Sequence, residues 1–425
     1  MTAAAPHPLA IRDFRFYWTA RLASTVAQMA MVIVIGWQVY DIARRSMDLH
    51  HAALQLGLIG VVQFVPLFAL TLVTGWTADR VDRRWIARAT IALELFCAAT
   101  LAALAWTGRT TLPSLFAVAA LLGVARAFAG PALGALAPNL VPRETLPRAI
   151  ALSSMSWQGG AIAGPALGGY LYAISAATPY LVGCALFGLS LLCMFLIGPI
   201  PRSDMGRGRH PWKQMVDGLH YVRRNRLVLG AISLDLFAVL LGGATAMLPV
   251  YARDILQAGP AGLGNLRAAP AVGATLTAAF FAWRPLKRDV GVKMLAAVGV
   301  FGGATIVFGV SRWMPLSLAC LALLGAADMF SVFVRQSLIQ LYTPDEMRGR
   351  VGAVSSLFIS ASNELGEAES GFLASLIGPV TAVVAGGAGA IAVTLLWAWW
   401  FPELRLARSF DPPNLRRSDT RETAT

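Results

Sequence analysis

Residues 75–84 read Gly-Trp-Thr-Ala-Asp-Arg-Val-Asp-Arg-Arg, a short charged stretch between two long apolar ones. The apolar stretches cover about 51–75 and 86–106 and carry few charges. About 20 mostly apolar residues are enough for a helix to cross the hydrocarbon core of a bilayer. The charged stretch is therefore predicted to be a tight loop that joins two transmembrane helices at one membrane surface.

The rest of the chain repeats this alternation. Of its 425 residues, 57% are hydrophobic and 13% are charged, whereas a soluble domain carries about 25% charged residues. This composition excludes a soluble enzyme and a secreted disulfide scaffold. The net charge of +13 does not indicate a nucleic-acid partner, because the basic residues lie in short gaps and not on one polar face. We predict an all-α membrane protein with twelve transmembrane helices, at about 16–40, 51–75, 86–106, 113–137, 150–173, 177–199, 227–250, 260–283, 291–310, 314–341, 350–374 and 378–401.

The basic residues also predict the orientation. With the N-terminus inside, the inner segments hold 26 Lys and Arg residues and the outer loops hold 5. Loops on the cytoplasmic side are the ones enriched in Lys and Arg. We therefore expect a multi-pass protein of the bacterial cytoplasmic (inner) membrane with both termini in the cytoplasm.

The longest polar gap, 201–226, divides six predicted helices from six. It predicts an N-terminal six-helix bundle at 1–200, a cytoplasmic linker at 201–226, a C-terminal six-helix bundle at 227–401 and a cytoplasmic tail at 402–425. Apolar residues between 212 and 222 recur at helical spacing. This favours an amphipathic helix on the inner membrane surface, and the alternative is a solvated linker.

The two halves resemble each other at an offset of 202 residues. The matching pairs, with no gap, are Gly123 and Gly325, Pro142 and Pro344, Glu144 and Glu346, Ser153 and Ser355, Gly164 and Gly366, and Gly169 and Gly371. Repeated six-helix halves are typical of secondary transporters, whose substrate path lies between the repeats.

The charged loop itself carries candidate functional residues. Gly75 would allow close helix approach, and Asp79 could bind the N-terminus of a neighbouring helix, where the dipole favours an anion. The arginines that could hold anionic lipid or acidic partners at the inner surface are Arg80, Arg83 and Arg84. The alternative is a plain positively charged loop.

The pattern Gly-x-x-x-Asp-Arg-x-x-Arg-Arg between helices 2 and 3 resembles the loop signature of the major facilitator superfamily, with Asp82 where that signature usually has glycine. Three further segments are similar to the drug:proton antiporter branch that holds enterobactin exporters and macrolide-efflux proteins: Phe14-Arg15, Pro142-Arg143-Glu144 and Pro344-x-Glu346. The resemblance covers about 13–401. It implies two pseudo-symmetric six-helix bundles around a central cavity lined by helices 1, 4, 7 and 10.

Helix 5 carries a run of small residues, namely Gly160, Gly164, Pro165, Gly168 and Gly169. Small residues at every fourth position let helices touch backbone to backbone. The run resembles the antiporter signature of exporters in the superfamily, and this resemblance favours export. Close helix packing without a role in transport is the alternative.

Helix 11 contains three carboxylates within six residues. Glu364 and Glu367 share one face through their spacing of three, and Glu369 lies closest to the outer end. Ionisable residues in a membrane helix are costly and mark ion or substrate pathways. This pair could therefore be a proton site or could bind a cationic substrate. The alternative is a solvent-wetted stretch at the outer mouth.

Arg126 in helix 4 and Asp328 in helix 10 occupy equivalent repeat positions, each near the middle of its helix. A buried charge must be paired or hydrated, so we expect this couple to face the central cavity implied by the resemblance. Asp235 in helix 7 is a third candidate. A structural ion pair between helices is the alternative for each of the three. We expect Arg335 to snorkel to the inner surface and Glu94 to be a structural partner.

The sequence contains no phosphate-binding Gly-x-x-x-x-Gly-Lys-[Ser/Thr] motif and no metal-ligand spacing, so we predict no enzyme activity, no cofactor and no metal site. We predict a monomeric secondary transporter that exports a small amphipathic molecule, such as a siderophore, a drug or a lysolipid, by proton antiport. Uptake or lysolipid flipping is the first alternative. A non-transporting ligand sensor is the second.

Overall fold

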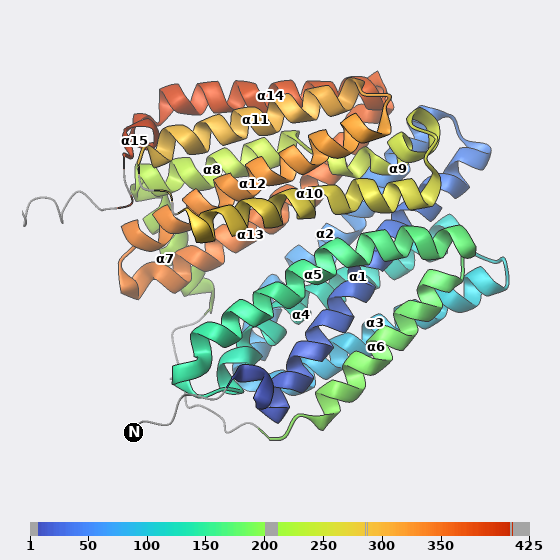
Figure 1. Cartoon of the computed structure of the whole chain (residues 1–425), viewed down its shortest axis with the longest axis horizontal. Helices are drawn as coiled ribbons and strands as arrows, with labels where there is room; N and C mark the ends of the chain where they lie inside the picture. Colours follow the sequence, from blue (N-terminus) through green and yellow to red (C-terminus); the bar gives the residue numbers. More distant parts are fainter. Residues whose placement is uncertain (1–6, 200–210, 285, 287, 409, 411–425) are drawn as a thin grey trace, which may run out of the picture. The chain divides into compact units, whose positions relative to one another are not determined.

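In the described part of the chain, twelve long helices follow one another (Figure 1). They are α1 (Arg12–Ser46), α2 (Leu49–Arg80), α3 (Arg83–Trp106), α4 (Leu112–Leu136), α5 (Leu146–Ile174), α6 (Thr178–Leu196), α8 (Arg226–Leu241), α10 (Gly259–Trp283), α11 (Val290–Val310), α12 (Met314–Tyr342), α13 (Asp345–Ile377) and α14 (Pro379–Trp400). Shorter helices are η1 (Pro8–Ala10), η2 (Ala137–Asn139), η3 (Arg143–Thr145), α7 (Pro211–Arg224), η4 (Ala244–Met247), α9 (Leu248–Val250), η5 (Tyr251–Ile255) and α15 (Pro402–Leu406).

This computed structural model describes residues 7–199, 211–284, 286, 288–408 and 410. Within helices and turns of these ranges, the side chains outside the description are those of residues 71, 72, 75, 76, 78–80, 131, 135, 143, 211–214 and 345.

The predicted all-helical membrane architecture is confirmed. In the described part of the chain, nine helical stretches are long and apolar enough to cross a membrane. The other three long helices, α5, α10 and α13, have the length but a lower hydropathy. In α5 glycine and serine replace larger apolar residues, and in α10 glycine and Arg267 do so. α13 carries Glu364, Glu367 and Glu369 within its apolar stretch.

Several helices begin at the polar residues that their sequences provide. The side chain of Asp48 accepts a hydrogen bond from the backbone N–H of His51 at the start of α2, and Thr111 forms a capping box with Ser114 at the start of α4. Such caps satisfy backbone donors that have no partner within the helix. α1 and α2 extend five or six residues beyond their predicted ends at 40 and 75. The apolar run marks the membrane boundary, whereas charged residues continue the helix without penalty.

The predicted span 227–250 is found as one of these nine stretches, Arg226–Ile255, but its helix is not continuous. α8 ends at Leu241, Gly242 caps it, and the chain resumes as η4, α9 and the π-helical turn η5. The two glycines at the break lie against neighbouring helices: a Cβ on Gly242 would be 2.5 Å from the Phe301 ring of α11, and one on Gly243 would be 2.6 Å from the Gly366 carbonyl of α13. Hydropathy does not reveal the break, since apolar residues flank it on both sides.

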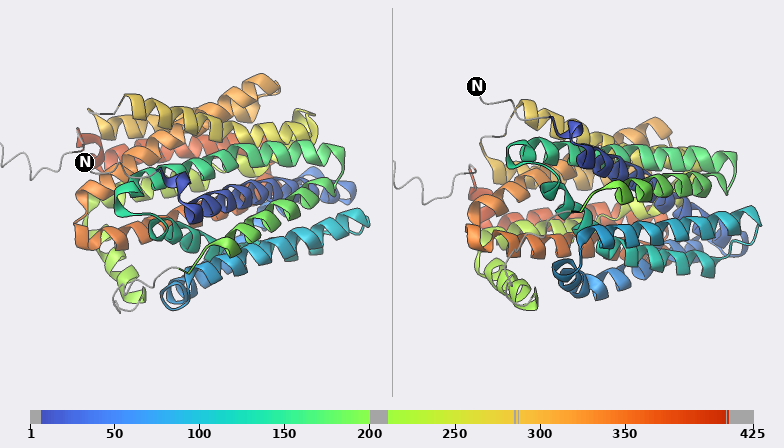
Figure 2. Two further views of the ribbon diagram at one scale, coloured as in Figure 1. Left: turned by 60° about the horizontal axis from the view of Figure 1, so that its bottom comes forward. Right: turned by 90° about the horizontal axis from the view of Figure 1, so that it is seen from below.

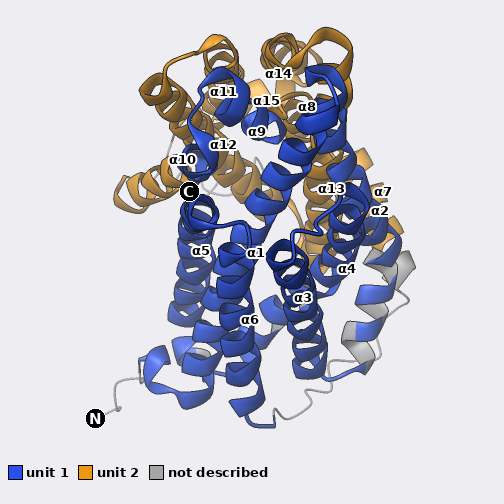
Figure 3. Cartoon of the chain, turned by 90° about the vertical axis from the view of Figure 1, so that its right-hand side faces the viewer, with its two compact units in different colours: residues 1–208, 245–271 blue, residues 209–244, 272–425 orange. Residues whose placement is uncertain are grey.

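The chain forms two compact units (Figure 3). Unit 1 comprises residues 1–208 and 245–271, and unit 2 comprises residues 209–244 and 272–425. The helix break at Gly242 and Gly243 lies next to a boundary between the units. The division of the chain at the linker 201–226 stays a prediction.

The two units share one packing pattern. In unit 1, α1 packs against α5 and α6, and α3 packs against α4 and α6; in unit 2, α8 packs against α13 and α14, and α11 packs against α12 and α14 (Figures 1 and 2). The corresponding helices follow one another in the same order along the chain: α1, α3, α4, α5 and α6 in unit 1 correspond to α8, α11, α12, α13 and α14 in unit 2. This equivalence is what the 202-residue repeat predicts.

A helix, α7, lies within the predicted linker, and its placement on the inner membrane surface stays a prediction. Val222 is 1% exposed and joins an apolar cluster with Val228 of α8 and Val354 of α13, while Val216 stays exposed. Arg350 of α13 also forms an ion pair with Asp217, with 3.3 Å between Nη1 and Oδ2. Part of the apolar face of α7 therefore packs on α8 and α13 within unit 2.

An ion-pair cluster ties the end of α1 to η5 within unit 1. Asp41 Oδ1 lies 3.2 Å from Arg253 Nη1, and Arg44 Nη2 lies 3.3 Å from Asp254 Oδ1. The hydroxyl of Tyr40 donates a hydrogen bond to Asp254. Arg253 and Asp254, two neighbouring residues of η5, thus each form an ion pair with α1. These pairs hold the segment after the helix break to α1.

Close contact of α1 with α5 generates the first prediction. A Cβ on Gly164 would lie 2.6 Å from Met29 Cβ and 2.7 Å from the Val26 carbonyl, whereas a Cβ on Gly188 of α6 meets nothing within 4 Å. Gly164→Ala should therefore destabilise the protein by about 1–3 kcal/mol through overpacking. Gly188→Ala should be neutral or stabilising by up to about 1 kcal/mol, because alanine favours a helix. Unfolding of the purified variants in detergent checks this, and equal effects of the two changes would contradict it.

Candidate functional site

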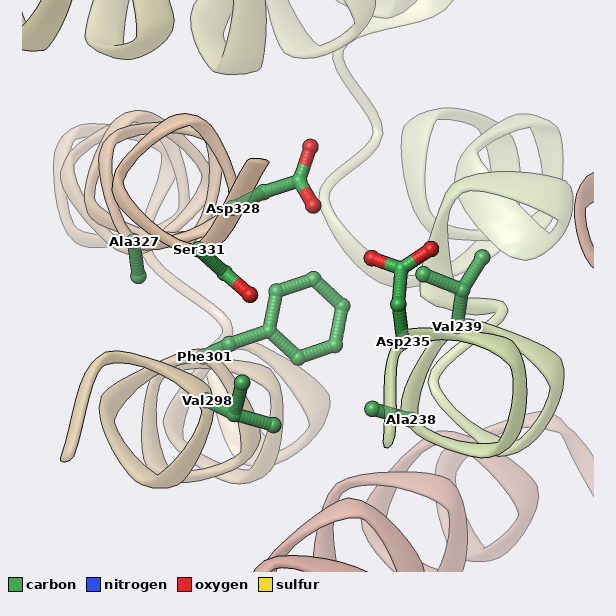
Figure 4. Close-up of a pocket in the computed structure, with 8 residues that line it drawn as sticks. All are labelled: Asp235, Ala238, Val239, Val298, Phe301, Ala327, Asp328 and Ser331. Carbon is green, nitrogen blue, oxygen red and sulfur yellow. The ribbon is translucent and has the colours of Figure 1, made fainter. Parts of the chain in front are cut away.

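A small pocket in unit 2 lies between α8, α11 and α12 (Figure 4). Its walls are largely apolar, and its polar residues are Asp235 of α8 with Asp328 and Ser331 of α12. The carboxylates of Asp235 and Asp328 both point to the space beside the Phe301 ring. The structure therefore brings together two of the acidic residues that the sequence singled out, from helices 7 and 10 of the predicted set.

One of these carboxylates is paired with a buried arginine. Asp235 is 6% exposed, Arg335 is 2% exposed, and Arg335 Nη1 forms an ion pair with Asp235 Oδ2. The expectation that Arg335 snorkels was wrong. A guanidinium has no need to reach the surface where a carboxylate on a neighbouring helix neutralises it.

Asp328 has different surroundings. Its side chain is half-buried, and in the described part of the chain no hydrogen bond or ion pair involves it. It lies seven residues before Arg335 on α12, which is two helical turns and hence the same face. The two carboxylates of the pocket therefore differ in that a cation neutralises only Asp235.

The glutamates of α13 lie beside the break in helix 7. Gly366 packs closely on the end of α8, where a Cβ would be 3.0 Å from the Val239 carbonyl. Glu364 is 5% exposed and Glu367 is half-buried. Glu364 is therefore too buried to belong to a solvent-wetted stretch. A role of this pair in proton or cation binding stays a prediction.

In unit 1, Arg126 lies among polar residues of neighbouring helices. Its Nη1 donates a hydrogen bond to Gln63 Oε1 of α2 at 2.8 Å. Glu94 of α3 is 3% exposed and accepts a hydrogen bond from Gln28 Nε2 at 3.3 Å. Glu94 therefore has the interhelical partner that a structural residue needs. The predicted approach of Arg126 and Asp328 to one central cavity stays a prediction.

The glycines of α5 let this helix pack directly against α1 and α10. A Cβ on Gly160 would be 2.6 Å from Thr25 Cγ2, and one on Gly168 would be 2.9 Å from the Ala30 carbonyl. Gly164 packs on α1 between these two. Pro165 and Gly169 face α10 instead, where a Cβ on Gly264 would be 2.7 Å from the Pro165 carbonyl. Both sides of α5 thus depend on small residues, and an additional role in the direction of transport stays a prediction.

The loop residues are described only in part. Gly75 and the side chains of Asp79 and Arg80 lie outside the described residues. Asp82, the departure from the loop signature, caps α3 by accepting a hydrogen bond from the backbone N–H of Arg84 at 3.0 Å.

The guanidinium of Arg84 also contacts other residues of the chain. It lies 2.6 Å from Asp82 in an ion pair and donates a hydrogen bond to the Gly198 carbonyl at the end of α6. Arg83 is half-buried. Contact of these arginines with lipid headgroups stays a prediction.

Sequence reasoning missed the partners of the site. The two-turn spacing of Arg335 from Asp328 places both on one face of α12, but it does not identify Asp235 as the partner of Arg335. Gln63 is a single amide in an apolar helix and could have been flagged as a partner for a buried charge. No sequence signal identifies Phe301 as part of the pocket. Among the described residues, no three His, Cys, Asp or Glu side chains form a group that could hold a metal ion.

The buried ion pair generates the second prediction. Arg335→Gln should lower the free energy of unfolding by about 3–5 kcal/mol, because it leaves Asp235 buried without a counter-charge. The double variant Asp235→Asn with Arg335→Gln should recover most of that loss. Thermal unfolding in detergent measures both, and strictly additive losses would contradict direct pairing.

The cap at Asp82 generates the third prediction. Hydrogen bonds from Arg84 hold the pKa of Asp82 below its ordinary value. A depressed pKa in the folded state gives stability that is present above the ordinary pKa and is lost as the pH falls through the folded value. Asp82→Ala should cost about 0.5–2 kcal/mol at neutral pH, and less in acid.

Asp82→Asn serves as the matched control, since asparagine retains the cap but not the charge. It should be nearly as stable as the wild type and should lack this acid-dependent loss. Unfolding midpoints across an acid titration measure the difference. A loss for Asp82→Ala that does not change with pH would contradict the assignment.

Known proteins resemble this chain over nearly its whole length. The sequence pattern of the Major Facilitator Superfamily matches residues 17–367. The Enterobactin exporter EntS of Escherichia coli O1:K1 / APEC is 27% identical over 417 residues, covering 96% of each chain. The Enterobactin exporter EntS of Shigella dysenteriae serotype 1 (strain Sd197) is 28% identical over 416 residues, with the same coverage.

Solved structures show the same fold at low sequence identity. A bacterial homologue of the human lysosomal transporter Spinster has a TM-score of 0.70 at 14% identity, covering 94% of this chain and 99% of its own. A D-xylose-proton symporter has a TM-score of 0.69 at 13% identity, covering 93% and 98%. The family consists of membrane transporters and not of enzymes. With its two equivalent helix sets, its nine strongly apolar spans and this family match, the chain belongs to the Major Facilitator Superfamily and is a multi-pass membrane transporter of small molecules.

Proposed function

We propose that this transporter exports a small amphipathic molecule of the siderophore or drug class by proton antiport. Enterobactin is the first substrate to test, because the relatives that align over 96% of the chain are enterobactin exporters. The transporter would act in the bacterial inner membrane, as a monomer, with both termini in the cytoplasm, as the distribution of Lys and Arg supports.

The observation that carries this proposal is the buried acidic pocket of unit 2. Two carboxylates from α8 and α12 point to one space with apolar walls. Carboxylates within transmembrane helices are retained where protons or ions move. A transporter without a nucleotide site needs an ion gradient for active export, and a titratable carboxylate within its helices can bind the coupling proton.

Alternating access would supply the transport cycle. In transporters built from repeats, one half rocks against the other around a site near the membrane midplane. The small-residue faces of α5 and the interrupted helix at Gly242 are where we expect such motion to take place. Gly75 and Asp79 would hold the cytoplasmic side closed in one state of the cycle.

The fourth prediction tests export and its driving force together. Purified protein in liposomes, with labelled enterobactin and an imposed proton gradient, should move enterobactin against its own gradient, and a protonophore should abolish this movement. Asp328→Asn should reduce the gradient-driven flux at least tenfold. Asp289→Asn is the matched control, because Asp289 is exposed and asparagine tolerates its positive φ of 54°.

Each outcome of this flux measurement distinguishes the alternatives. Movement only down the enterobactin gradient would indicate uptake or facilitated passage, and lipid movement without enterobactin movement would indicate lysolipid flipping. Binding without any flux would indicate a sensor. Equal gradient-driven flux in Asp328→Asn and the control would remove Asp328 from the coupling site. In the same assay Asp79→Asn should lower flux while enterobactin binding is kept, and unchanged flux would end the gating role.

A further inference from the structure

We infer that Arg335 is a positioning residue that keeps Asp235 permanently ionised, so that Asp328 alone carries the coupling proton. This inference rests on the proposed proton antiport and selects one carrier among the acidic residues of helices 7 and 10. It assigns different tasks to two carboxylates that line the same pocket (Figure 4).

The first step is the ion pair between α8 and α12. Both partners are almost fully buried, with Asp235 at 6% and Arg335 at 2% exposure. An arginine side chain keeps its charge in proteins. Protonation of Asp235 would therefore leave a buried guanidinium without a counter-charge, which is the costly arrangement for a buried pair. Asp235 stays ionised for as long as Arg335 faces it.

The second step is the position of Asp328. Its carboxylate points to the same space as that of Asp235, beside the Phe301 ring, and no cation is paired with it in the described part of the chain. Ser331, one turn along α12, lies in the same pocket and is 4% exposed. Two carboxylates that share one site do not both remain ionised at no cost, since like charges repel. The proton goes to the one whose charge is not neutralised, and that one is Asp328.

The third step is the set of charges around Asp328 within unit 2. α8 contributes Asp235, and α12 itself contributes Arg335. The only charged residue of α11 is Lys293, which is exposed near the start of that helix, and residues 272–283 of α10 contain none. α13 contributes acidic residues, of which Glu364 is the most buried. Among the described residues of these elements, Arg335 is thus the one buried cation, and it is paired with Asp235.

The exchange involves one proton and no other bond change. The ionised carboxylate of Asp328 binds a proton to give the acid, and it releases the same proton on the other side of the membrane. The ion pair of Asp235 and Arg335 keeps its charge in both states. The three groups together therefore change from one net negative charge to none. In this scheme the ion pair sets the charge of the pocket, and Asp328 switches it.

Infrared spectroscopy of the protonated carboxyl group tests this assignment without substrate or membrane gradient. The full-length protein would be purified with isotopically labelled aspartate in lipid nanodiscs and titrated with acid. The other aspartates contribute C=O stretches of their own, so the Asp328 band is the difference between the wild type and Asp328→Asn. This difference band should grow with acid. In Asp235→Asn the band should persist and should grow only at lower pH, because a negative neighbour has been removed.

The arginine variants test the positioning role. Arg335→Gln should add a titrating aspartate band that the wild type lacks, whereas the conservative Arg335→Lys should add none. If Arg335→Gln does not fold, the double variant Asp235→Asn with Arg335→Gln removes both buried charges, and it should show the Asp328 band without the added one. A band that is lost in Asp235→Asn and kept in Asp328→Asn would overturn the inference. So would a wild-type spectrum that contains no band sensitive to Asp328→Asn, or an Arg335→Gln spectrum without the added band.

These spectra and the liposome flux fail independently. Absence of enterobactin movement with the expected spectra would remove the proposed substrate but leave the division of tasks between Asp235 and Asp328. Proton-driven flux with contradictory spectra would leave antiport in place and move the carrier to another residue.

Discussion

A guanidinium buried between two membrane helices is the constraint on which unit 2 depends. Arg335 cannot shed its charge, and a charge at this depth costs several kcal/mol unless it is paired. The carboxylate of Asp235 meets that requirement across the interface of α8 and α12. The pair fixes which faces of these two helices meet, and the apolar cluster beside it, which includes Leu234, Met294 and Leu338, packs around that alignment. The pocket with Asp328 lies between these two helices and α11.

Small residues are the second requirement, since charged pairs alone cannot bring helix backbones together. In unit 1 the glycines of α5 let it lie directly on α1, and in unit 2 Gly366 does the same for α13 against α8. Apolar side chains gain little by leaving lipid for another apolar surface, so close van der Waals contact carries much of the association. The repeated positions Gly164 and Gly366 explain why the two units share one packing pattern.

Much of this could be predicted from the sequence. The twelve helices follow from apolar length, and the family follows from the loop 75–84. The helix break at Gly242 could not be predicted, because hydropathy is continuous across it and glycines are frequent elsewhere in the chain. The sequence shows Asp82 only as a departure from the loop signature and does not indicate that Asp82 caps α3.

The site was predictable by residue type but not by partner. Asp235 and Asp328 were singled out because charges are rare in membrane helices, and both do line one pocket. That Arg335 neutralises Asp235 could not be deduced, since 100 residues separate them in the chain and α12 alone suggests an arginine near the surface. Periodicity gives the face of a helix, whereas the neighbour on that face depends on tertiary packing.

The central claim is that one carboxylate in unit 2 exchanges a proton for the exported molecule. Proton release on addition of enterobactin to weakly buffered, purified protein measures this exchange most directly. The account predicts that the wild type and Asp289→Asn release a proton when enterobactin binds at a pH at which Asp328 is protonated, and that Asp328→Asn binds without release. Release from Asp328→Asn equal to that of the wild type would contradict it.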